Sequence, residues 1–300
     1  MIGQGGPGET PPATPGRVKV GRTDPVAEAL RRESRHFTGH RYGKSVELLE
    51  GILRRKDLKP RQRFEALCRK AESLERIGRT RAALEILSAV TKSHPNEPLG
   101  FSLLGEYLFR VAEDPFGALV ALGRALEMSP EDPDTLWWRG QVYQSGMGDM
   151  KRAKESYLYA LRADPKYVQA MESLAVLAES SGKWIEAVDW RKAQYLREKR
   201  ASSLSAIAEL YLRLGNFSAA WKYSASAVLR SRGDASAWLT HAKTLSASGL
   251  LVRAKSALER YASLADYRMG PHIYPRDMFW LEPLLDFPRT AGIVARMSAQ

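Results

Sequence analysis

A period close to 34 residues runs through most of this 300-residue chain. It is clearest in a series of alanines that mark equivalent places in successive segments. These are Ala83, Ala118, Ala153, Ala187, Ala220 and Ala254, with steps of 35, 35, 34, 33 and 34 residues. A fixed period of this length is typical of arrays of helix pairs, in which each repeat is one structural unit. The chain is therefore predicted to be all-α.

Each repeat is predicted to hold two antiparallel helices joined by a tight turn. Apolar residues at helical spacing mark a first helix, and the alanine lies in the second. In four repeats a glycine stands five residues before the alanine, where the chain must turn: Gly78, Gly182, Gly215 and Gly249. A proline closes the earlier repeats because it cannot continue a helix. One helix pair cannot bury its apolar face alone, so neighbouring pairs must stack.

These units resemble the tetratricopeptide repeat family, whose signature is W-x2-L-G-x2-Y, then A-x3-F, then Pro. The best matches are Phe101-x2-Leu104-Gly105-x2-Leu108, and Gly140-x2-Tyr143 with Ala153-x3-Tyr157 and Pro165. The resemblance implies a right-handed superhelical solenoid of antiparallel helix pairs. Two departures stand out. Arg191 replaces the family's aromatic residue, and the internal turns AEDP and SGMGD each hold one extra residue.

The pattern divides the chain into four parts. Residues 1–23 are rich in Gly and Pro and are predicted to be a disordered tail. Residues 24–63 form a degenerate helical capping pair, and residues 64–267 hold six repeats. Residues 268–300 are expected to be an aromatic and Pro-rich C-terminal cap, because a terminal repeat needs a cover for its apolar face. The alternative is that this segment occupies the groove or docks a partner.

Charge is distributed unevenly along the chain. The net charge of +12 divides into +9 over residues 1–96, −6 over residues 97–190 and +9 over residues 191–300. Basic ends favour acidic partners, whether protein, nucleic acid or lipid head groups. The single cysteine excludes an intramolecular disulfide. We find neither a signal peptide nor an apolar run of about 18 residues, so a cytoplasmic location is expected.

Motifs for chemistry are not found. His36 and His40 are four residues apart, but Gly39 lies between them and no third ligand is near, so no metal is expected. The glycines of the N-terminal segment neither follow a strand nor open a helix, so they do not form a phosphate loop. We expect no cofactor and no catalytic residues, and therefore not an enzyme.

In the repeat family the first helix of each pair lines a concave groove that commonly binds a peptide or helix. The resemblance places the following residues in that partner-binding groove: Arg69, Glu72, Arg76, Glu106, Phe109, Arg110, Trp137, Trp138, Gln141, Gln144, Glu172, Glu179, Glu209, Arg213 and Lys243. Their acids concentrate towards the middle, which suggests a basic or amphipathic ligand. The Lys and Asn residues of the family's clamp for chaperone C-terminal carboxylates are absent.

Trp137 and Trp138 are not explained by the repeat signature, whose packing position falls on Leu136. Consecutive residues of a helix point about 100° apart, so at least one indole should face the groove. Trp137 is the preferred candidate for a binding anchor, because large aromatic residues dominate interface energetics. The alternative is that both indoles pack in the core.

The sequence thus predicts a non-catalytic scaffold or adaptor that binds a protein partner. The alternative is a basic helical-repeat protein that associates with nucleic acid. For this the strongest signal is the run RRKDLKPRQR at residues 54–63. That run can also be a solvated helix end and loop, or a docking site for an acidic protein. A third option is an accessory domain of a catalytic partner chain.

Overall fold

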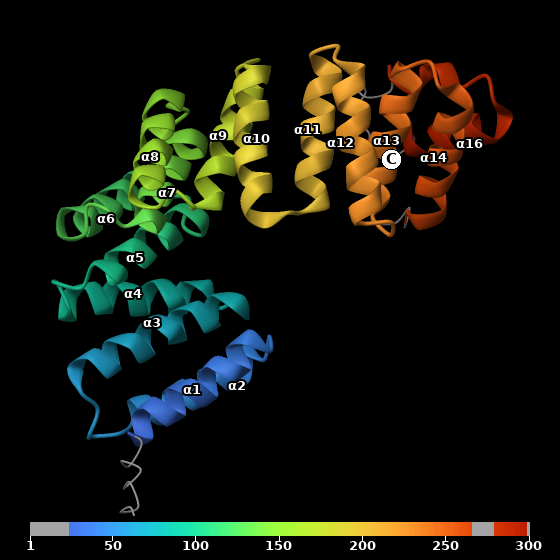
Figure 1. Cartoon of the computed structure of the whole chain (residues 1–300). Coiled ribbons are helices and arrows are strands. Elements are labelled where there is room, and N and C mark those ends of the chain that lie inside the picture. Colours follow the sequence, from blue (N-terminus) through green and yellow to red (C-terminus); the bar gives the residue numbers. More distant parts are fainter. Residues whose placement is uncertain (1–23, 266–278, 299–300) are drawn as a thin grey trace, which may run out of the picture. The chain divides into compact units, whose positions relative to one another are not determined.

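The computed structural model describes residues 24–265 and 279–298. The chain is all-α, and it divides into two compact units, residues 1–93 and residues 94–300. Figure 1 shows the helices of both units in chain order. The predicted N-terminal tail, residues 1–23, lies outside the described residues, as does the first part of the predicted C-terminal cap.

In its described residues, from 24 to 93, the first unit contains four helices, which are α1 (Pro25–Thr38), α2 (Tyr42–Leu53), α3 (Pro60–Arg76) and α4 (Thr80–Ser93). Asp24 caps α1 by accepting a hydrogen bond from the Val26 N–H at 2.9 Å. Helix α3 begins before the predicted start of the repeats at residue 64. The basic run 54–63 therefore forms the connection between α2 and α3 and the first turn of α3. Arg63 donates to the carbonyl oxygens of Leu53 and Arg55, at the end of α2.

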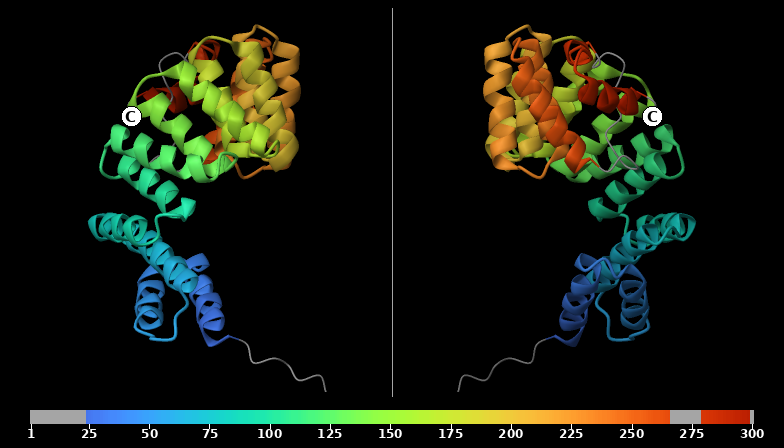
Figure 2. Two further views of the ribbon diagram at one scale, coloured as in Figure 1. Left: turned by 90° about the vertical axis from the view of Figure 1, so that its left-hand side faces the viewer. Right: turned by 90° about the vertical axis from the view of Figure 1, so that its right-hand side faces the viewer.

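The second unit is also built of antiparallel helix pairs. Its elements are α5 (Pro98–Arg110), α6 (Pro115–Met128), α7 (Pro133–Gln141), the π-turn η1 (Val142–Gly146), α8 (Met150–Ala163), α9 (Val168–Ser180), α10 (Trp184–Glu198), α11 (Ala201–Arg213), α12 (Phe217–Arg230), α13 (Ala235–Ala247), α14 (Leu251–Leu264), the short η2 (Glu282–Leu284) and α16 (Pro288–Ser298). From α9 to α14 the helices lie side by side in Figures 1 and 2.

The turns form where the sequence places them. Four predicted turn glycines, Gly78, Gly182, Gly215 and Gly249, have φ angles between 68° and 79°. This left-handed conformation favours glycine because a Cβ atom would be strained there. Aspartates cap α1, α6, α7, α8 and α13, and among the described residues six α-helices begin with proline, where no backbone donor is lost.

The repeated alanines are the contact points between helices. All six are fully buried. The residues four places later are also buried in the regular repeats, namely Leu87, Leu122, Tyr157 and Leu258. The two helices of a pair can approach closely where the first helix has a glycine at the point of contact. A Cβ atom on Gly140 would lie 2.3 Å from Cε1 of Tyr157, and one on Gly105 would lie 2.6 Å from Cγ of Leu122.

The two extra residues are accommodated in different ways. In the AEDP turn, Glu113 takes a φ of 53° and Asp114 then caps α6 through the Gly117 N–H. In the next repeat the sequence places the extra residue in the SGMGD turn, and the structure corrects this. A π-turn starts at Val142 and takes up the residue within the end of the helix, and Gly148 makes the turn with a φ of 67°.

The described C-terminal residues pack on the last helix pair. Leu281, Leu284, Ile293 and Val294 are buried against α13 and α14, in one cluster that includes Leu258. In the same segment, Phe279 and Leu285 are 66% and 44% exposed. The buried contact is therefore made by aliphatic side chains, while the aromatic side chain of Phe279 is largely exposed to solvent.

Candidate functional site

The first helices of successive pairs carry most of the predicted groove residues of the second unit. Between α7 and α9 their side chains surround a pocket of about 270 Å³. Its lining consists of Trp137, Gln141, Gln144, Gln169, Glu172, Ser173 and Val176. Four of these seven are residues that the repeat phase places in the groove. The sequence interpretation missed Gln169, Ser173 and Val176 as lining residues.

A hydrogen-bond network fixes the floor of this pocket. The Ser173 hydroxyl accepts from Nε1 of Trp137 at 2.9 Å and from Nε2 of Gln141 at 3.0 Å. The Tyr157 hydroxyl donates to Oε1 of Gln144 at 2.7 Å. Burial raises the pKa of Tyr157, so the phenol remains a neutral donor at any physiological pH. Gln144 lies within the π-turn.

The two tryptophans pack towards different neighbours. Trp137 is half-buried and contacts the cluster of α7, α8 and α9. Trp138 packs on α6 together with Phe109, and the Arg110 guanidinium lies 5.8 Å from its ring centroid. The two indoles meet edge to face, with their centroids 4.6 Å apart. Both rings are therefore packing residues, and Trp137 also presents part of its surface to the pocket.

The acidic residues in the middle of the groove have cationic partners within the chain. Arg191 pairs with Glu179 at 3.0 Å and with Glu172 at 3.6 Å. This explains why an arginine replaces the family's aromatic residue, since its guanidinium joins α10 to α9. The Glu172 side chain is 55% exposed and is the more accessible of the two acids.

A second ion pair joins α11 and α13. Nζ of Lys243 lies 3.1 Å from a Glu209 carboxylate oxygen, and the Thr240 hydroxyl donates to the same oxygen at 3.0 Å. Lys243 is only 5% exposed, so its charge serves this contact. At the end of α11, Arg213 is exposed and places its guanidinium 5.4 Å from the ring centroid of Trp184.

The remaining groove candidates fall into two local clusters. In the first unit Arg69 pairs with the buried Glu33 at 2.9 Å, and Arg76 is exposed next to Glu75. Glu72 is half-buried on the same helix, α3. In the second unit Arg110 pairs with Glu106 at 2.5 Å on α5. Arg69 is thus a packing residue of α1 and α3.

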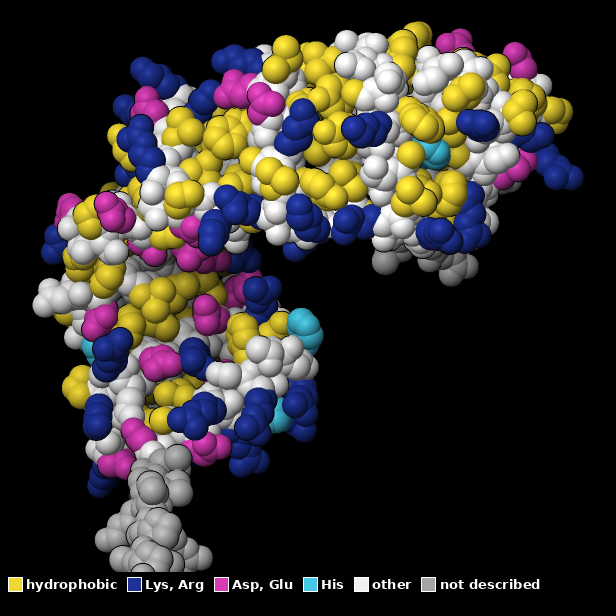
Figure 3. Space-filling model, viewed as in Figure 1, with side chains coloured by type: hydrophobic (Ala, Val, Ile, Leu, Met, Phe, Trp, Pro, Cys, Tyr) yellow, Lys and Arg dark blue, Asp and Glu magenta, His cyan; other side chains and the backbone are white. Residues whose placement is uncertain are grey.

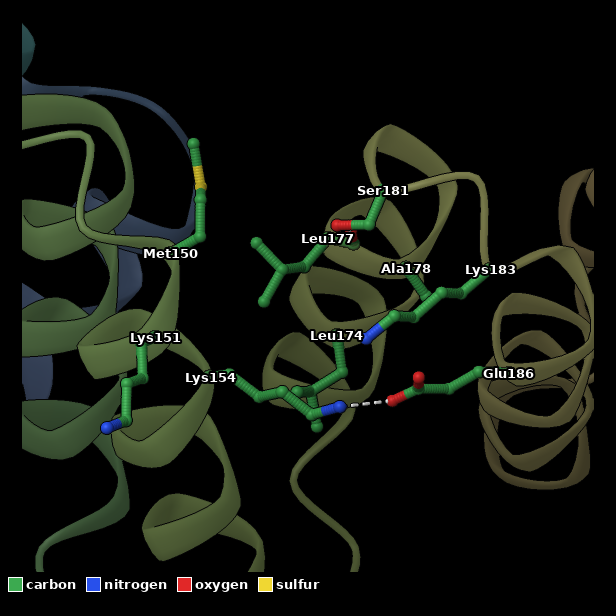
Figure 4. A pocket seen from close by; sticks show the side chains of 9 residues that line it. All are labelled: Met150, Lys151, Lys154, Leu174, Leu177, Ala178, Ser181, Lys183 and Glu186. Atoms are coloured by element: carbon green, nitrogen blue, oxygen red, sulfur yellow. Dashed lines mark hydrogen bonds and ion pairs between the residues drawn. The ribbon is translucent and has the colours of Figure 1, made fainter.

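A second pocket, of about 280 Å³, lies among α8, α9 and α10. Leu174, Leu177 and Met150 give it apolar walls. Figure 4 shows Lys154 of α8 and Glu186 of α10 joined across it at 2.5 Å, with Lys183 reaching in beside them. The ion pair lowers the pKa of Glu186, mainly through the hydrogen bond from Lys154. The pair connects two successive repeats.

Charged and apolar side chains alternate on the surface of the second unit. On the face seen in Figure 3, Lys and Arg side chains are scattered among hydrophobic ones over α9 to α14. Within the described ranges, no helix is both long and apolar enough to pass through a membrane. The same ranges contain no group of three His, Cys, Asp or Glu residues placed to hold a metal ion.

Comparison with known proteins identifies the repeats. A family model described as tetratricopeptide repeat matches residues 65–97, and a second with the same description matches residues 143–193. A TPR repeat-containing protein of Methanocaldococcus jannaschii is 43% identical over 54 residues. That match spans 17% of this chain and 9% of the relative's length, so it concerns the repeat alone.

Solved structures share the fold at low sequence identity. A tetratricopeptide repeat protein from Parabacteroides merdae covers 80% of this chain and 93% of its own, with a TM-score of 0.54 and 18% identity. The type IV pilus biogenesis factor PilW covers 68% and 92%, with a TM-score of 0.58 and 18% identity. YrrB, described as a TPR protein with an unusual peptide-binding site, covers 59% and 91%, with a TM-score of 0.50 and 16% identity. These matches show that the chain contains tetratricopeptide repeats at residues 65–97 and 143–193, and that it shares the fold of solved proteins of this kind.

Proposed function

We propose that this protein is a non-catalytic interaction scaffold that binds an extended segment of a partner protein at the pocket between α7 and α9. The observation that carries the proposal is the lining of that pocket. Three glutamine side chains converge there with the apolar surfaces of Trp137 and Val176. The predicted groove and the observed pocket coincide at four residues.

The chemistry of this lining suits a peptide backbone. A glutamine amide carries both donors and an acceptor, as a peptide group does. Gln141 and Gln144 each use one polar atom within the network around Ser173 and Tyr157, which orients their remaining atoms. Gln169 is exposed at the rim. The indole of Trp137 and the Val176 side chain then offer an apolar wall for one aliphatic or aromatic ligand side chain.

The internal ion pairs limit how acidic this site is. Glu179 and Glu209 are engaged by Arg191 and Lys243, so they contribute less to the capture of a basic peptide than the sequence interpretation assumes. Glu172 remains accessible at the pocket. We therefore infer recognition of the ligand backbone and one apolar side chain, with a single acidic contact. The peptide-binding site for which YrrB is described supports a peptide as ligand, by analogy of fold.

Nucleic acid is a less favoured ligand than a peptide, for a physical reason. Base stacking needs accessible aromatic faces. On α10 to α12 the chain's own cations cover such faces. Lys192 lies 5.4 Å from the ring centroid of Tyr211, and Lys199 and Arg230 lie 5.2 and 5.8 Å from that of Tyr195. These rings serve internal cation–π contacts.

The test is a peptide-display selection with the full chain, followed by calorimetry on an enriched 12-residue peptide. Val176→Arg should lower the affinity at least about tenfold, because it places a charged side chain in the apolar wall. Val176 is 39% exposed, so the fold should persist. The matched control is Val252→Arg on α14, where the valine is 75% exposed and outside the pocket.

Three results would overturn the proposal. One is equal affinity of the peptide for the Val176→Arg and wild-type chains. Another is a selection in which no peptide is enriched on the wild-type chain relative to the Val176→Arg chain. The third is tighter binding of a 12-nucleotide single strand than of any peptide, at physiological salt; a steep salt dependence would then identify phosphate contacts.

A further inference from the structure

A separate pocket of about 540 Å³ lies where the described C-terminal residues meet the ends of α12 and α13. Its lining is unlike the rest of this basic chain. Among the described residues it contains three aromatic residues and two acids, and no lysine or arginine. These residues are Phe217, Ser246, Ala247, Phe279, Trp280, Glu282, Pro283 and Asp286.

The aromatic rings form an angular group around the opening. Trp280 lies edge to face with Phe279 at 5.2 Å and with Phe217 at 6.1 Å, measured between ring centroids. Phe217 and Phe279 are 37% and 66% exposed. Glu282 and Asp286 are exposed, and no ion pair engages either carboxylate among the described residues. Ring faces and carboxylates both attract a cation.

The preceding repeat shows what occupies the equivalent place. Helix α10 begins with Trp184, helix α11 ends with Arg213, and this guanidinium lies 5.4 Å from the indole centroid. One repeat later, α12 begins with the aromatic Phe217, but α13 ends with Ala247. The aromatic residue is therefore retained where the arginine is not. Arg76 and Arg110 also close first helices, whereas α7 ends with Gln141 and α9 with Ser180, so an arginine closes three of these six helices.

From this comparison we propose that the pocket binds an arginine side chain presented by a partner protein. The guanidinium takes the place that Arg213 holds one repeat earlier, against the ring of Phe217. Its planar fork donates to Glu282 or Asp286, a geometry that an ammonium group does not match. The C-terminal end of α13 also carries the negative end of a helix dipole, which favours a cation.

The pocket is independent of the groove between α7 and α9, so the two proposals can fail separately. Val176→Arg should not affect it. The arginine belongs either to the partner that binds in the groove or to a second partner protein.

The probe is N-acetyl-L-arginine amide, titrated into the full chain labelled with ¹⁵N at its tryptophan indoles. N-acetyl-L-citrulline amide is the neutral control, since its planar head group has nearly the same shape. Trp280→Phe assigns the indole signal of Trp280. Arginine should shift that signal with a dissociation constant on the order of 1 mM, as for one cation–π contact with a carboxylate nearby. Citrulline should bind at least about fivefold more weakly.

Variants locate the site without disturbing the core. Phe279→Ala and Asp286→Asn alter exposed residues, and each should weaken arginine binding several-fold. Phe116→Ala on α6, where the ring is 68% exposed, and Glu131→Gln are the matched controls and should bind normally. Ala247→Arg restores within the chain the arginine that this repeat lacks. It should shift the Trp280 signal by itself and abolish the response to the probe.

Equal binding of arginine and citrulline would overturn the proposal, because the pocket would then be merely apolar. Unchanged binding in both Phe279→Ala and Asp286→Asn would also overturn it, by placing the site elsewhere. So would an unchanged response of the Ala247→Arg chain.

Discussion

At the scale of the residue, single glycines decide how closely the helices of a pair approach. Gly140 of α7 faces Tyr157 of α8, a fully buried ring that packing holds in place. Gly123 of α6 is also helical, but a Cβ atom there would meet nothing within 4 Å. The two positions therefore separate the packing effect of an added methyl group from its effect on backbone freedom.

Gly140→Ala should destabilise the protein by about 1–3 kcal/mol, because the methyl group overpacks the contact with Tyr157. Gly123→Ala should instead stabilise it by roughly 0.5–1 kcal/mol, since alanine loses less conformational freedom in a helix. Urea denaturation followed by circular dichroism measures both. If Gly140→Ala were as stabilising as Gly123→Ala, the close approach of α7 and α8 would not limit packing.

Sequence reasoning reaches as far as residues whose role follows from the period. The six buried alanines and the four turn glycines are of this kind. The period does not predict contacts that depend on which side chain of a neighbouring helix lies against a given residue. Ser173 accepts hydrogen bonds from Trp137 and Gln141, and Arg191 pairs with Glu172 and Glu179. These partners lie on different helices and are 12 to 36 residues apart in the sequence. No local pattern marks such pairs, so the lining of the candidate site was only partly predicted.

At the scale of the element, the π-turn is the feature that makes the pocket of the α7 repeat unlike its neighbours. The extra residue is visible in the sequence as a longer repeat, but its location is not. One extra residue can lengthen the turn between the helices or widen the last turn of the helix, and the number of residues is the same in both cases. Packing determines which of the two forms. Here Val142 is fully buried on the α6 cluster, which holds the start of the widened turn in the helix.

Deleting Ser145, an exposed residue of the π-turn, should return this repeat to a regular helix. The shortened connection should shift α7 against α8 and break the hydrogen bond between Gln144 and the Tyr157 hydroxyl, at a cost of about 1 kcal/mol. Helix content should be retained, while the enriched peptide binds several-fold more weakly. Circular dichroism and calorimetry measure the two effects. Full affinity in the deletion variant would show that the π-turn has no part in the site.

At the scale of the whole molecule, the period predicts an all-α array of stacked pairs, and the structure confirms it. The period cannot show how such an array ends, because the terminal segment has no repeat to be compared with. We propose that residues 279–298 are the cover of the last pair. Leu281 and Leu284 contact α13 and α14 with no exposed surface, whereas Phe279 and Leu285 of the same segment remain exposed.

A repeat array interacts mainly between nearest neighbours, so damage at one end should stay near that end. The double variant Leu281→Ala and Leu284→Ala removes two buried side chains from the cluster on α14, at a cost of roughly 4 kcal/mol or more. Hydrogen exchange should then accelerate in α13, α14 and α16, while the amides of α5 to α8 keep their protection. The control, Phe279→Ala with Leu285→Ala, removes exposed side chains and should leave exchange unchanged throughout. Uniform acceleration across residues 94–265 would instead mean that the second unit unfolds as one cooperative body, and that its end stabilises all of its repeats together.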